Sequence, residues 1–482
     1  MPKNCINFNH LVKKYSDSPA LMSQTTTLSY YQYFGYINDV SGLLKKEGVH
    51  SGSKVVVLSE INFYFPILFF SILVLGGIVV PVNPKFPTMK ILSLLADIDC
   101  EFIVTFDSGL TPDFEKKFKV LSIESLFKRL VENKRYQIFP SLKFDNFATI
   151  IFTSGTRGKP KGVLHTIGNH YYSAAGSNLN IPLNQDDCWM VSLPFYHIAA
   201  IAILFRTMIA GAGCFIPDSV QNLSYYIEHH HITHTSLVTT QLHRWIADDN
   251  ITDSVKSLKA ILIGGSYIPQ SLIKKALTRE LPVFTSYGST EMSSQITTTS
   301  AGDLIKQPVS SGKLLSYRKL KINIKGEIMV KGKTLCYGYV AGKKISGCRD
   351  QYGWFHTGDL GLYDRYKNLH VHGRIDNMFI SGGENIYPEE IELQLQYQQN
   401  IRKVCVVDIP DEEYGARPVA FIKMEDQKVI NESGLKKFLG ERIESFKIPV
   451  KFLDWPEDIG RLKPDRTYLR ELAITLVMSS GD

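Results

Sequence analysis

Short apolar runs alternate with longer helix-like stretches over most of the chain. Runs rich in β-branched and aromatic residues predict buried strands; they include KVVVLSE, GGIVVPV, CEFIVTF, ATIIFTS, CWMVSLPF, ITHTSLVTT, LKAILIGG and PVFTSYG. Between them lie stretches that predict helices, such as SYYQYFGYINDVSGLLKKEG and PQSLIKKALTREL. This alternation predicts an α/β protein whose large N-terminal part holds mostly parallel sheets flanked by helices.

The pattern changes twice toward the C-terminus. From about residue 312, KLKINIKGEIMVKGKTLCYGY predicts strands joined by turns, as in a small antiparallel β subdomain. The final part predicts an α+β unit, from NIYPEEIELQLQYQ, IRKVCVVDIPDE, RPVAFIKME and NESGLKKFLGERI, and is large enough to fold alone. We therefore expect an N-terminal domain over 1–375 and a mobile C-terminal domain over 376–482, with the boundary near GRIDN, residues 373–377.

One stretch could be mistaken for a membrane span. INFYFPILFFSILVLGGIVVPVNP, residues 61–84, carries no charge and is long enough for a transmembrane candidate. Gly76 and Gly77 divide it into a helix-length half and the strand-like IVVPV, and prolines follow at 81 and 84. A buried helix that leads into a buried parallel strand explains this better, so we expect no stable membrane insertion.

Composition narrows the class of protein. The chain has 482 residues, 44% apolar and 21% charged, which is typical of a globular protein of two or three domains. The formal net charge of +7 suits anionic small molecules, but no basic block indicates a nucleic-acid partner. The seven cysteines are scattered, odd in number and without metal-ligand spacing, which favours reduced thiols in a cytoplasmic protein.

The stretch IIFTSGTRGKPKGVLHT, residues 150–166, starts as a strand and continues as a loop rich in glycine, hydroxyls and cations. Glycines let backbone amides approach a ligand closely, and the other side chains add donors and positive charge. We expect the loop to bind a polyphosphate; a solvated basic turn is the alternative. It is not a Walker loop, because Lys161 follows a proline and the required Gly-Lys-Ser/Thr ending is missing.

Further motifs follow in order: LPFYHIA (193–199), YGSTE (287–291), GWFHTGDLG (353–361), GRIDNMFISGGENIYPEEIE (373–392) and the tail IGRLKPDRTYLREL. With the loop, this set closely resembles the adenylate-forming superfamily of acyl- and aryl-CoA ligases, luciferases and peptide-synthetase adenylation domains. ITHTSLVTTQLHRW, AILIGGSYIPQSL and YGSTEMSSQITT look most like the o-succinylbenzoate–CoA ligases of menaquinone synthesis. The segment 373–392 also resembles benzoate-type and chlorobenzoate CoA ligases.

The resemblance implies an AMP-forming acid–thiol ligase that uses ATP, Mg2+ and coenzyme A. A carboxylate, here 2-succinylbenzoate, would attack the α-phosphate of ATP; the C-terminal domain would then rotate, and coenzyme A would take the acyl group. Such chemistry needs mainly positioning and charge neutralisation from the protein. A ligase for another aryl or fatty acid, a non-catalytic nucleotide-binding relative, and a homo-oligomer are left open.

The resemblance also implies residue roles. Phosphate binding falls to Thr153, Ser154, Gly155, Thr156, Gly158 and Lys161, and Mg2+ binding to Thr156 and Glu291. Adenine, ribose and the adjoining wall are expected at Gly264, Gly265, Ser266, Tyr287, Gly288, Thr290, Asp359 and Arg374. His197 would help to receive the substrate carboxylate, Gly382 and Gly383 would contact the pantetheine channel, and Asp376 would be the hinge.

Several of these residues have a purely structural interpretation as well. Glu291 could complement a helix dipole, and Tyr287 could be a structural aromatic residue. Asp359 and Arg374 could form a buried pair without a ligand, and His197 could be a core histidine.

The tail departs from the family pattern, which is roughly Pro-Arg-Thr-x-x-Gly-Lys-x-x-Arg. The family lysine reaches the acyl carboxylate and the α-phosphate during adenylation. Counting back from Arg470 and Leu472 leads to the start of RTYLREL, where we assign Arg466 to its position, with Lys463 three residues earlier. Three possibilities stay open: Arg466 substitutes, although a guanidinium is wider than an ammonium; Lys463 reaches in; or adenylation is impaired.

Overall fold

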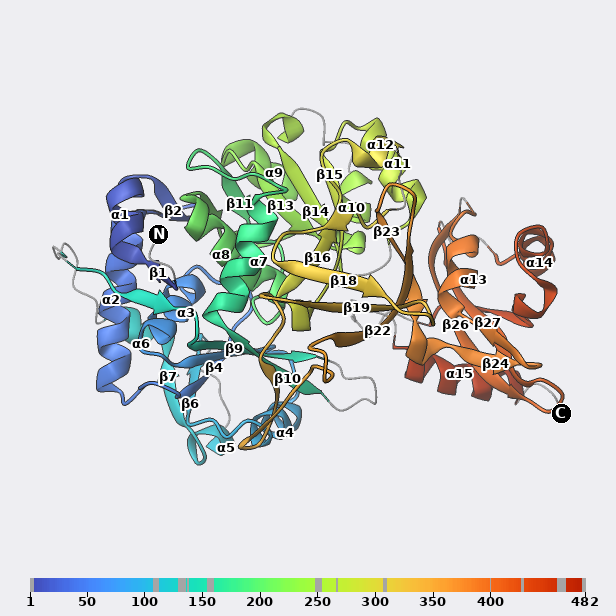
Figure 1. The fold of residues 1–482 in the computed structure, drawn as a ribbon, viewed down its shortest axis with the longest axis horizontal. Helices are drawn as coiled ribbons and strands as arrows, with labels where there is room; N and C mark the ends of the chain where they lie inside the picture. Colours follow the sequence, from blue (N-terminus) through green and yellow to red (C-terminus); the bar gives the residue numbers. More distant parts are fainter. Residues whose placement is uncertain are drawn as a thin grey trace.

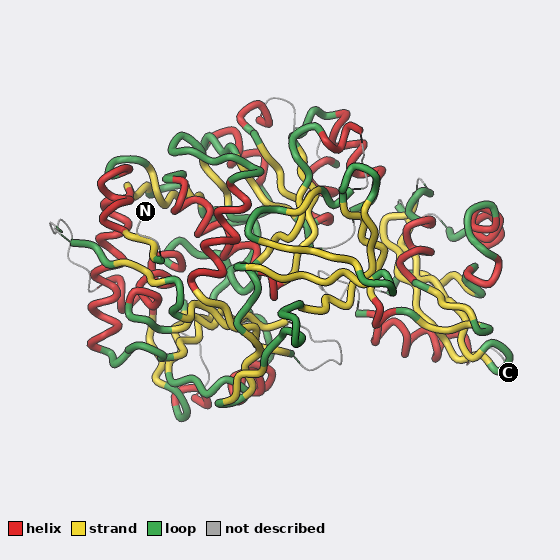
Figure 2. Tube along the Cα trace, viewed as in Figure 1, coloured by secondary structure: helices red, strands yellow, loops and turns green. Residues whose placement is uncertain are grey.

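The computed structural model describes residues 4–106, 112–128, 136, 138–153, 160–247, 254–265, 268–306, 310–398, 400–425, 429–456 and 465–478. A large body holds most of the chain, and a smaller C-terminal unit lies at one side of it (Figure 1). In the large body, strands gather at the centre and many of the helices lie outside them (Figure 2). This is the α/β arrangement that the alternating pattern predicts.

The first large sheet carries the strands on both sides of the predicted phosphate loop. Among the described residues its order is β21 (Lys344–Ser346), β20 (Gly338–Ala341), β10 (Lys161–Thr166), β9 (Phe147–Thr153), β5 (Ile78–Val82), β4 (Lys54–Leu58), β6 (Phe102–Thr105) and β7 (Lys119–Ser122). The strands from β9 to β7 are parallel, whereas β10 pairs antiparallel with both β9 and β20. The two strands that flank the predicted phosphate loop therefore lie at one edge of the parallel part.

The second large sheet carries the YGSTE motif. Its order within the described part is β17 (Lys313–Leu314), β16 (Ser294–Thr298), β15 (Val283–Ser289), β14 (Ala260–Ile263), β13 (His234–Leu237), β11 (Cys188–Met190), β12 (Gly213–Phe215), β2 (Pro19–Met22) and β3 (Thr27–Ser29). It is parallel from β15 to β2 and antiparallel at both ends. A short pair, β1 (Cys5–Asn7) and β8 (Ser141–Lys143), lies apart from it.

Helices of the large body pack on these sheets. Their bounds are α1 (Phe8–Tyr15), α2 (Tyr30–Lys46), α3 (Phe65–Val74), α4 (Thr88–Ala96), α5 (Pro112–Glu115), α6 (Ile123–Lys128), α7 (Ile167–Asn178), α8 (Ile198–Ala210), α9 (Leu223–His229), α10 (Thr239–Ile246), α11 (Gln270–Thr278) and α12 (Asp303–Lys306), with 3-10 turns η2 (Ser254–Ser257) and η3 (Thr290–Met292). Ser29 begins α2 with a capping box, in which its side chain accepts from the Gln32 amide and the Gln32 side chain accepts from the Ser29 amide.

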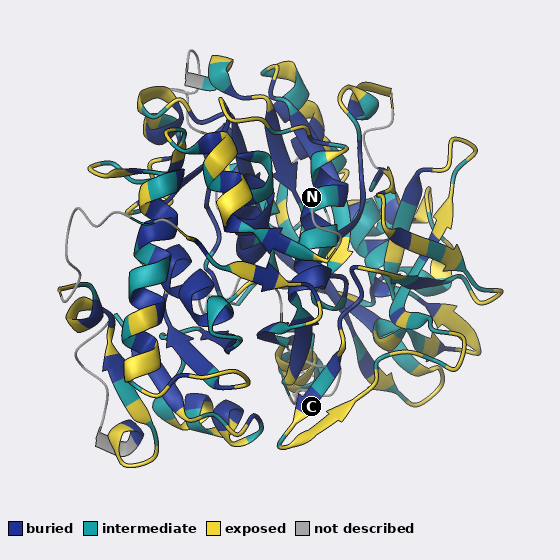
Figure 3. Ribbon diagram, turned by 60° about the vertical axis from the view of Figure 1, so that its left-hand side comes forward, coloured by how far each residue is buried: buried dark blue, intermediate teal, exposed yellow. Residues whose placement is uncertain are grey.

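The uncharged stretch 61–84 forms part of the main core, as predicted. It divides into α3, which ends before Gly76 in the left-handed conformation, and the buried strand β5. The ring of Phe65 stacks on Phe195 at 4.1 Å between centroids. Side chains from both large sheets share this core, and buried residues concentrate on their strands (Figure 3). Full burial of each such side chain contributes ~1.5–3 kcal/mol. Within the described ranges, no helix is both long and apolar enough to cross a membrane.

The segment after residue 312 forms an antiparallel sheet, as the sequence predicts. Its order is β18 (Arg318–Ile322), β19 (Glu327–Gly332), β22 (Phe355–Tyr363) and β23 (Leu369–Arg374). Strands β22 and β23 lie on the side of the body that faces the C-terminal unit (Figure 1). The GWFHTGDLG and GRIDN motifs are therefore placed next to that unit.

The C-terminal unit follows the turn η4 (Ile375–Asn377). It contains β24 (Phe379–Ser381), β25 (Glu384–Ile386), α13 (Pro388–Leu395), β26 (Ile401–Asp411), β27 (Gly415–Met424), α14 (Glu432–Gly440), η5 (Ser445–Lys447), β28 (Lys451–Asp454) and α15 (Arg466–Met478). Alternate residues of β26 point to opposite faces of the sheet: Val404 and Val406 pack with α13 and α14, and Cys405 and Val407 with α15. The unit thus has an apolar core on each face of its own sheet.

Candidate active site

Asp359 is the centre of one polar cluster between the body and the C-terminal unit. Asp359 in β22 pairs with Arg374 in the neighbouring strand β23, and Arg374 Nη1 donates to Asp359 Oδ1 at 3.1 Å. Tyr287, near the end of β15, donates its hydroxyl to Oδ2 at 2.6 Å. A carboxylate has about four lone-pair sites, which makes it a suitable acceptor for the hydroxyl groups of a ligand.

The phenol of Tyr287 is a permanent donor in this cluster. Burial raises the pKa of Tyr287 well above its ordinary value, and the negative charge of Asp359 raises it further. The hydroxyl therefore stays protonated at neutral pH and points its hydrogen at the carboxylate. The family resemblance places Asp359 and Arg374 at one ribose site, with a direct pair as the structural alternative; the hydrogen bond from Tyr287 is an addition from the structure.

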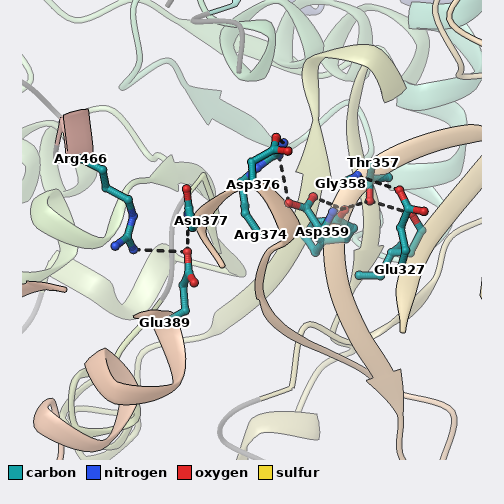
Figure 4. Close-up of polar contacts among 11 residues, drawn as sticks. Glu327, Thr357, Gly358, Asp359, Arg374, Asp376, Asn377, Glu389 and Arg466 are labelled. Atoms are coloured by element: carbon teal, nitrogen blue, oxygen red, sulfur yellow. Dashed lines mark hydrogen bonds and ion pairs between the residues drawn. The ribbon is translucent and has the colours of Figure 1, made fainter. Parts of the chain in front are cut away.

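Arg374 connects Asp359 to the predicted hinge. Its Nη2 donates to Asp376 Oδ2 at 3.2 Å, so one guanidinium joins two carboxylates (Figure 4). Gly358, next to Asp359 within β22, has a φ of 71°, and a Cβ there would lie 3.0 Å from Arg374 Nη2. Glycine is required there both for the left-handed backbone and for the approach of the guanidinium.

A second cluster joins Lys161 and Glu291 through a residue that carried no sequence signal, Tyr339. Strand β20 places Tyr339 opposite Val163 in β10, and the Lys161 Nζ lies 5.2 Å from the centre of the Tyr339 ring. The Tyr339 hydroxyl donates to Glu291 Oε1 at 3.0 Å. Burial, followed by the charge of Glu291, raises the pKa of Tyr339, so this hydroxyl is also a stable donor.

A chain of buried neutral groups fixes the backbone next to Glu291. His165 Nε2 lies 2.7 Å from the Thr290 carbonyl oxygen, and Thr149 Oγ1 lies between His165 Nδ1 and His170 Nε2, at 3.2 and 2.9 Å. Burial lowers the pKa of His165 to about 4, so the ring is neutral near pH 7. The carbonyl can only accept; therefore Nε2 carries the hydrogen, and Thr149 donates to Nδ1.

The other predicted residues fall as follows. His197 is exposed just before α8, which excludes the core-histidine interpretation. Thr153 pairs with Lys161 across the mouth of the loop, and Gly264 and Gly265 follow β14. At Gly288 a Cβ would lie 2.0 Å from the Ser294 carbonyl oxygen, so this glycine is needed for close strand packing. Gly382 and Gly383 form the turn between β24 and β25.

Several predicted site residues lie outside the described residues, and Arg466 lies apart from both clusters. Ser154, Gly155, Thr156, Gly158, Ser266 and Lys463 lie outside the described ranges. Arg466 begins α15 in the C-terminal unit, where it contacts Glu389 and Glu392. The structure thus brings together two groups of predicted residues, Tyr287 with Asp359 and Arg374, and Lys161 with Glu291.

Comparison with known proteins agrees with this arrangement. A family model described as AMP-binding enzyme matches residues 8–340. The 2-succinylbenzoate–CoA ligase of Geobacillus sp. (strain WCH70) is 32% identical over 424 residues, which cover 85% of this chain and 86% of that protein. The solved o-succinylbenzoate CoA synthetase of Bacillus subtilis, in complex with the acyl-adenylate intermediate OSB-AMP, aligns with a TM-score of 0.86 at 30% identity over 96% of both chains. The same synthetase in complex with ATP and magnesium ion aligns with a TM-score of 0.84 at 30% identity, over 93% of this chain and 95% of that one.

Proposed function

The chain belongs to the AMP-binding enzymes, and we propose that it is an AMP-forming 2-succinylbenzoate–CoA ligase of menaquinone biosynthesis. With ATP and Mg2+ it adenylates the acid and releases pyrophosphate. Coenzyme A then takes the acyl group, which gives o-succinylbenzoyl-CoA and AMP. The observation that carries the proposal is the pair of clusters around Asp359 and Glu291, in a chain 30% identical over 96% of its length to a synthetase solved with OSB-AMP.

The Asp359 cluster suits the nucleoside part of ATP. A mostly buried carboxylate, with a side chain 15% exposed, accepts ribose hydroxyls, and Arg374 is a second donor group at the same place. Because the hydroxyl of Tyr287 is bound to Asp359, its ring is oriented and offers a face to the adenine. Gly264, Gly265, Gly288 and Thr290 complete this side of the proposed nucleotide site.

The Glu291 cluster suits Mg2+ and the phosphates. Within the described part of the chain, Tyr339 donates to Oε1 of Glu291 and no protein donor reaches Oε2, which leaves a hard oxygen ligand for a divalent cation. Lys161 adds a positive charge at the same edge, where it neutralises phosphate oxygens. When bound, Mg2+ supplies charge neutralisation on the phosphates that leave as pyrophosphate.

The acid and thiol sites are assigned by position. His197, exposed at the start of α8, is proposed to receive the carboxylate, and Gly382 and Gly383 are proposed to line the path of pantetheine. For the domains we propose 1–375 and 376–482, which meet at η4; the separate apolar cores of the C-terminal unit support this boundary. The cytoplasmic location and the oligomeric state stay predictions.

The test is pyrophosphate release with ATP, Mg2+ and 2-succinylbenzoate, with and without coenzyme A, beside a panel of benzoates and fatty acids. Turnover that prefers 2-succinylbenzoate and forms its CoA thioester is the expected result. Preference for another acid would support the ligase activity and refute 2-succinylbenzoate as the substrate. Nucleotide binding without turnover of any acid would favour the non-catalytic relative.

A further inference from the structure

Arg466 occupies the position that the family pattern reserves for the adenylating lysine, but its guanidinium is already bound. Nη2 lies 2.8 Å from Glu392 Oε1 and 3.3 Å from Glu389 Oε1. Nη1 donates to the Val406 carbonyl oxygen at 2.5 Å. The side chain of Arg466 is 25% exposed and that of Glu392 only 12% exposed, so this ion pair is largely shielded from water.

The partners of Arg466 hold one another as well. Glu389 and Glu392 lie three residues apart on α13 and therefore share one face of the helix. Glu392 Oε1 accepts the backbone N–H of Val406 at 2.6 Å, while Arg466 takes the carbonyl of the same residue. The result is a closed set of contacts that joins the start of α15, the inner face of α13 and strand β26. We call these four residues, Arg466, Glu389, Glu392 and Val406, the Arg466 clamp.

The clamp also reaches the predicted hinge. Asn377, the last residue of η4, donates its side-chain amide to Glu389 Oε1 at 2.5 Å. Figure 4 shows Asn377 and Arg466 meeting at Glu389, close to Asp376 and Arg374. The terminal helix is thus tied through one carboxylate to the segment about which the C-terminal unit is proposed to turn.

All partners of Arg466 in the clamp follow Asp376 in sequence. They would turn together with Arg466 when the C-terminal unit rotates, so rotation by itself does not free the guanidinium. Removing one partner of a buried ion pair is strongly destabilising, because the remaining charge is left without compensation. Glu389, Glu392 and the Val406 carbonyl take three of the five guanidinium N–H donors and hold the group against α13 and β26. Held there, the guanidinium is not presented to an acyl carboxylate and an α-phosphate.

We infer that Arg466 is a positioning residue, which fixes α15 on α13 beside the hinge, and that it does not replace the adenylating lysine. This inference rests on the proposed two-step ligase reaction. It follows that Arg466 supports both steps equally, because each step needs the C-terminal unit to be correctly assembled. A residue that contacts the reacting carboxylate would instead matter for the first step alone.

The experiment separates the two steps in the full-length enzyme. ATP–pyrophosphate exchange with 2-succinylbenzoate measures adenylation, and thioester formation from synthetic 2-succinylbenzoyl-AMP and coenzyme A measures the second step. The variants are Arg466→Gln, Arg466→Lys, Glu392→Gln and the double Arg466→Gln/Glu392→Gln. Arg470→Gln is the control, because it removes an arginine of the same helix whose partner is Asp408.

We expect Arg466→Gln and Glu392→Gln to slow both steps by a similar factor, roughly tenfold to a hundredfold in kcat, with little change in KM for ATP. The double variant should be no slower than either single one, since both remove the same contact. Arg466→Lys should not recover either step, because an ammonium cannot span two carboxylates and a carbonyl as the planar fork does. Arg470→Gln should leave both steps within about twofold of wild type.

Two results would overturn the inference. One is a fall in the ATP–pyrophosphate exchange rate of Arg466→Gln while its rate of thioester formation stays at the wild-type level and Glu392→Gln keeps both wild-type rates. The other is Arg466→Lys with faster adenylation than wild type, as expected if the position calls for an ammonium. Failure of the proposed function is distinguishable: the wild type itself would carry out neither step with 2-succinylbenzoate. In that case, thermal unfolding of the same four variants still tests the clamp, and additive losses in Tm would refute it.

Discussion

Replacing Tyr339 by phenylalanine tests the least expected contact of the candidate site. The substitution keeps the ring beside Lys161 and removes only the hydroxyl that donates to Glu291 Oε1 at 3.0 Å. A hydrogen bond to a charged group contributes ~1.5–3 kcal/mol. If Glu291 must be held in place to bind Mg2+, this loss corresponds to a fall in rate of about 10- to 100-fold, at 1.36 kcal/mol for each factor of ten.

The assay is pyrophosphate release at saturating ATP and acid, titrated with Mg2+. We expect Tyr339→Phe to lower kcat by that factor and to raise the Mg2+ concentration needed for half-maximal rate. Thioester formation from the synthetic adenylate should be unchanged, because the pyrophosphate has already left. Tyr337→Phe is the control: this tyrosine is 53% exposed and packs on Phe147 instead. If Tyr339→Phe released pyrophosphate at a rate within twofold of wild type and needed no more Mg2+, the role given to Tyr339 would be refuted.

Three further predictions concern other contacts. Tyr287→Phe removes the 2.6 Å bond to Asp359 and should raise KM for ATP about tenfold; an unchanged KM would show that the bond does not orient the site. Burial lowers the pKa of His165 to about 4 from 6.5, so the unfolded state binds the proton more readily and stability falls as the pH drops below 6.5. In urea titrations, His165→Gln should therefore lose ~2 kcal/mol less than wild type between pH 7 and pH 5, and equal losses would contradict this. Gly312 and Gly302 have φ of 78° and 77°, but a Cβ at Gly312 would lie 2.0 Å from a backbone carbon, and one at Gly302 meets no described atom within 4 Å. Gly312→Ala should lower the free energy of unfolding by more than ~3 kcal/mol, and Gly302→Ala should lower it by ~1 kcal/mol. Similar urea midpoints of unfolding for the two variants would refute the steric argument.

Local patterns were sufficient to predict the elements that depend on neighbouring residues. The glycine pair divides the uncharged stretch 61–84 into α3 and β5, and residues 65–73 and 78–82 are buried because nearly all of them are apolar. Family motifs assigned Asp359 and Arg374 to one ribose site, and β-strand register does bring the two residues together. These predictions need no knowledge of distant contacts.

Contacts between distant segments were not predictable in the same way. Tyr339 reaches Glu291 because β20 pairs with β10, and the sequence of a short strand does not specify its partner. His165 reads as one more residue of a strand, and its bond to the Thr290 carbonyl depends on how the two large sheets approach each other. Arg466 could be aligned with the family lysine, but the carboxylates around it are fixed by the packing of α13 on β26.

Because β10 pairs with β20, the site can be completed only late in the synthesis of the chain. Strand β10 begins right after the phosphate loop, but its second neighbour is made only when the ribosome reaches residues 338–341. Until then β10 is an edge strand whose free N–H and C=O groups can pair with another chain. A polypeptide that stops before Gly338 contains the whole loop and Glu291, but it lacks Tyr339 and exposes that edge. Tight binding of nucleotide is therefore a property of nearly complete chains, and truncated ones are directed toward aggregation.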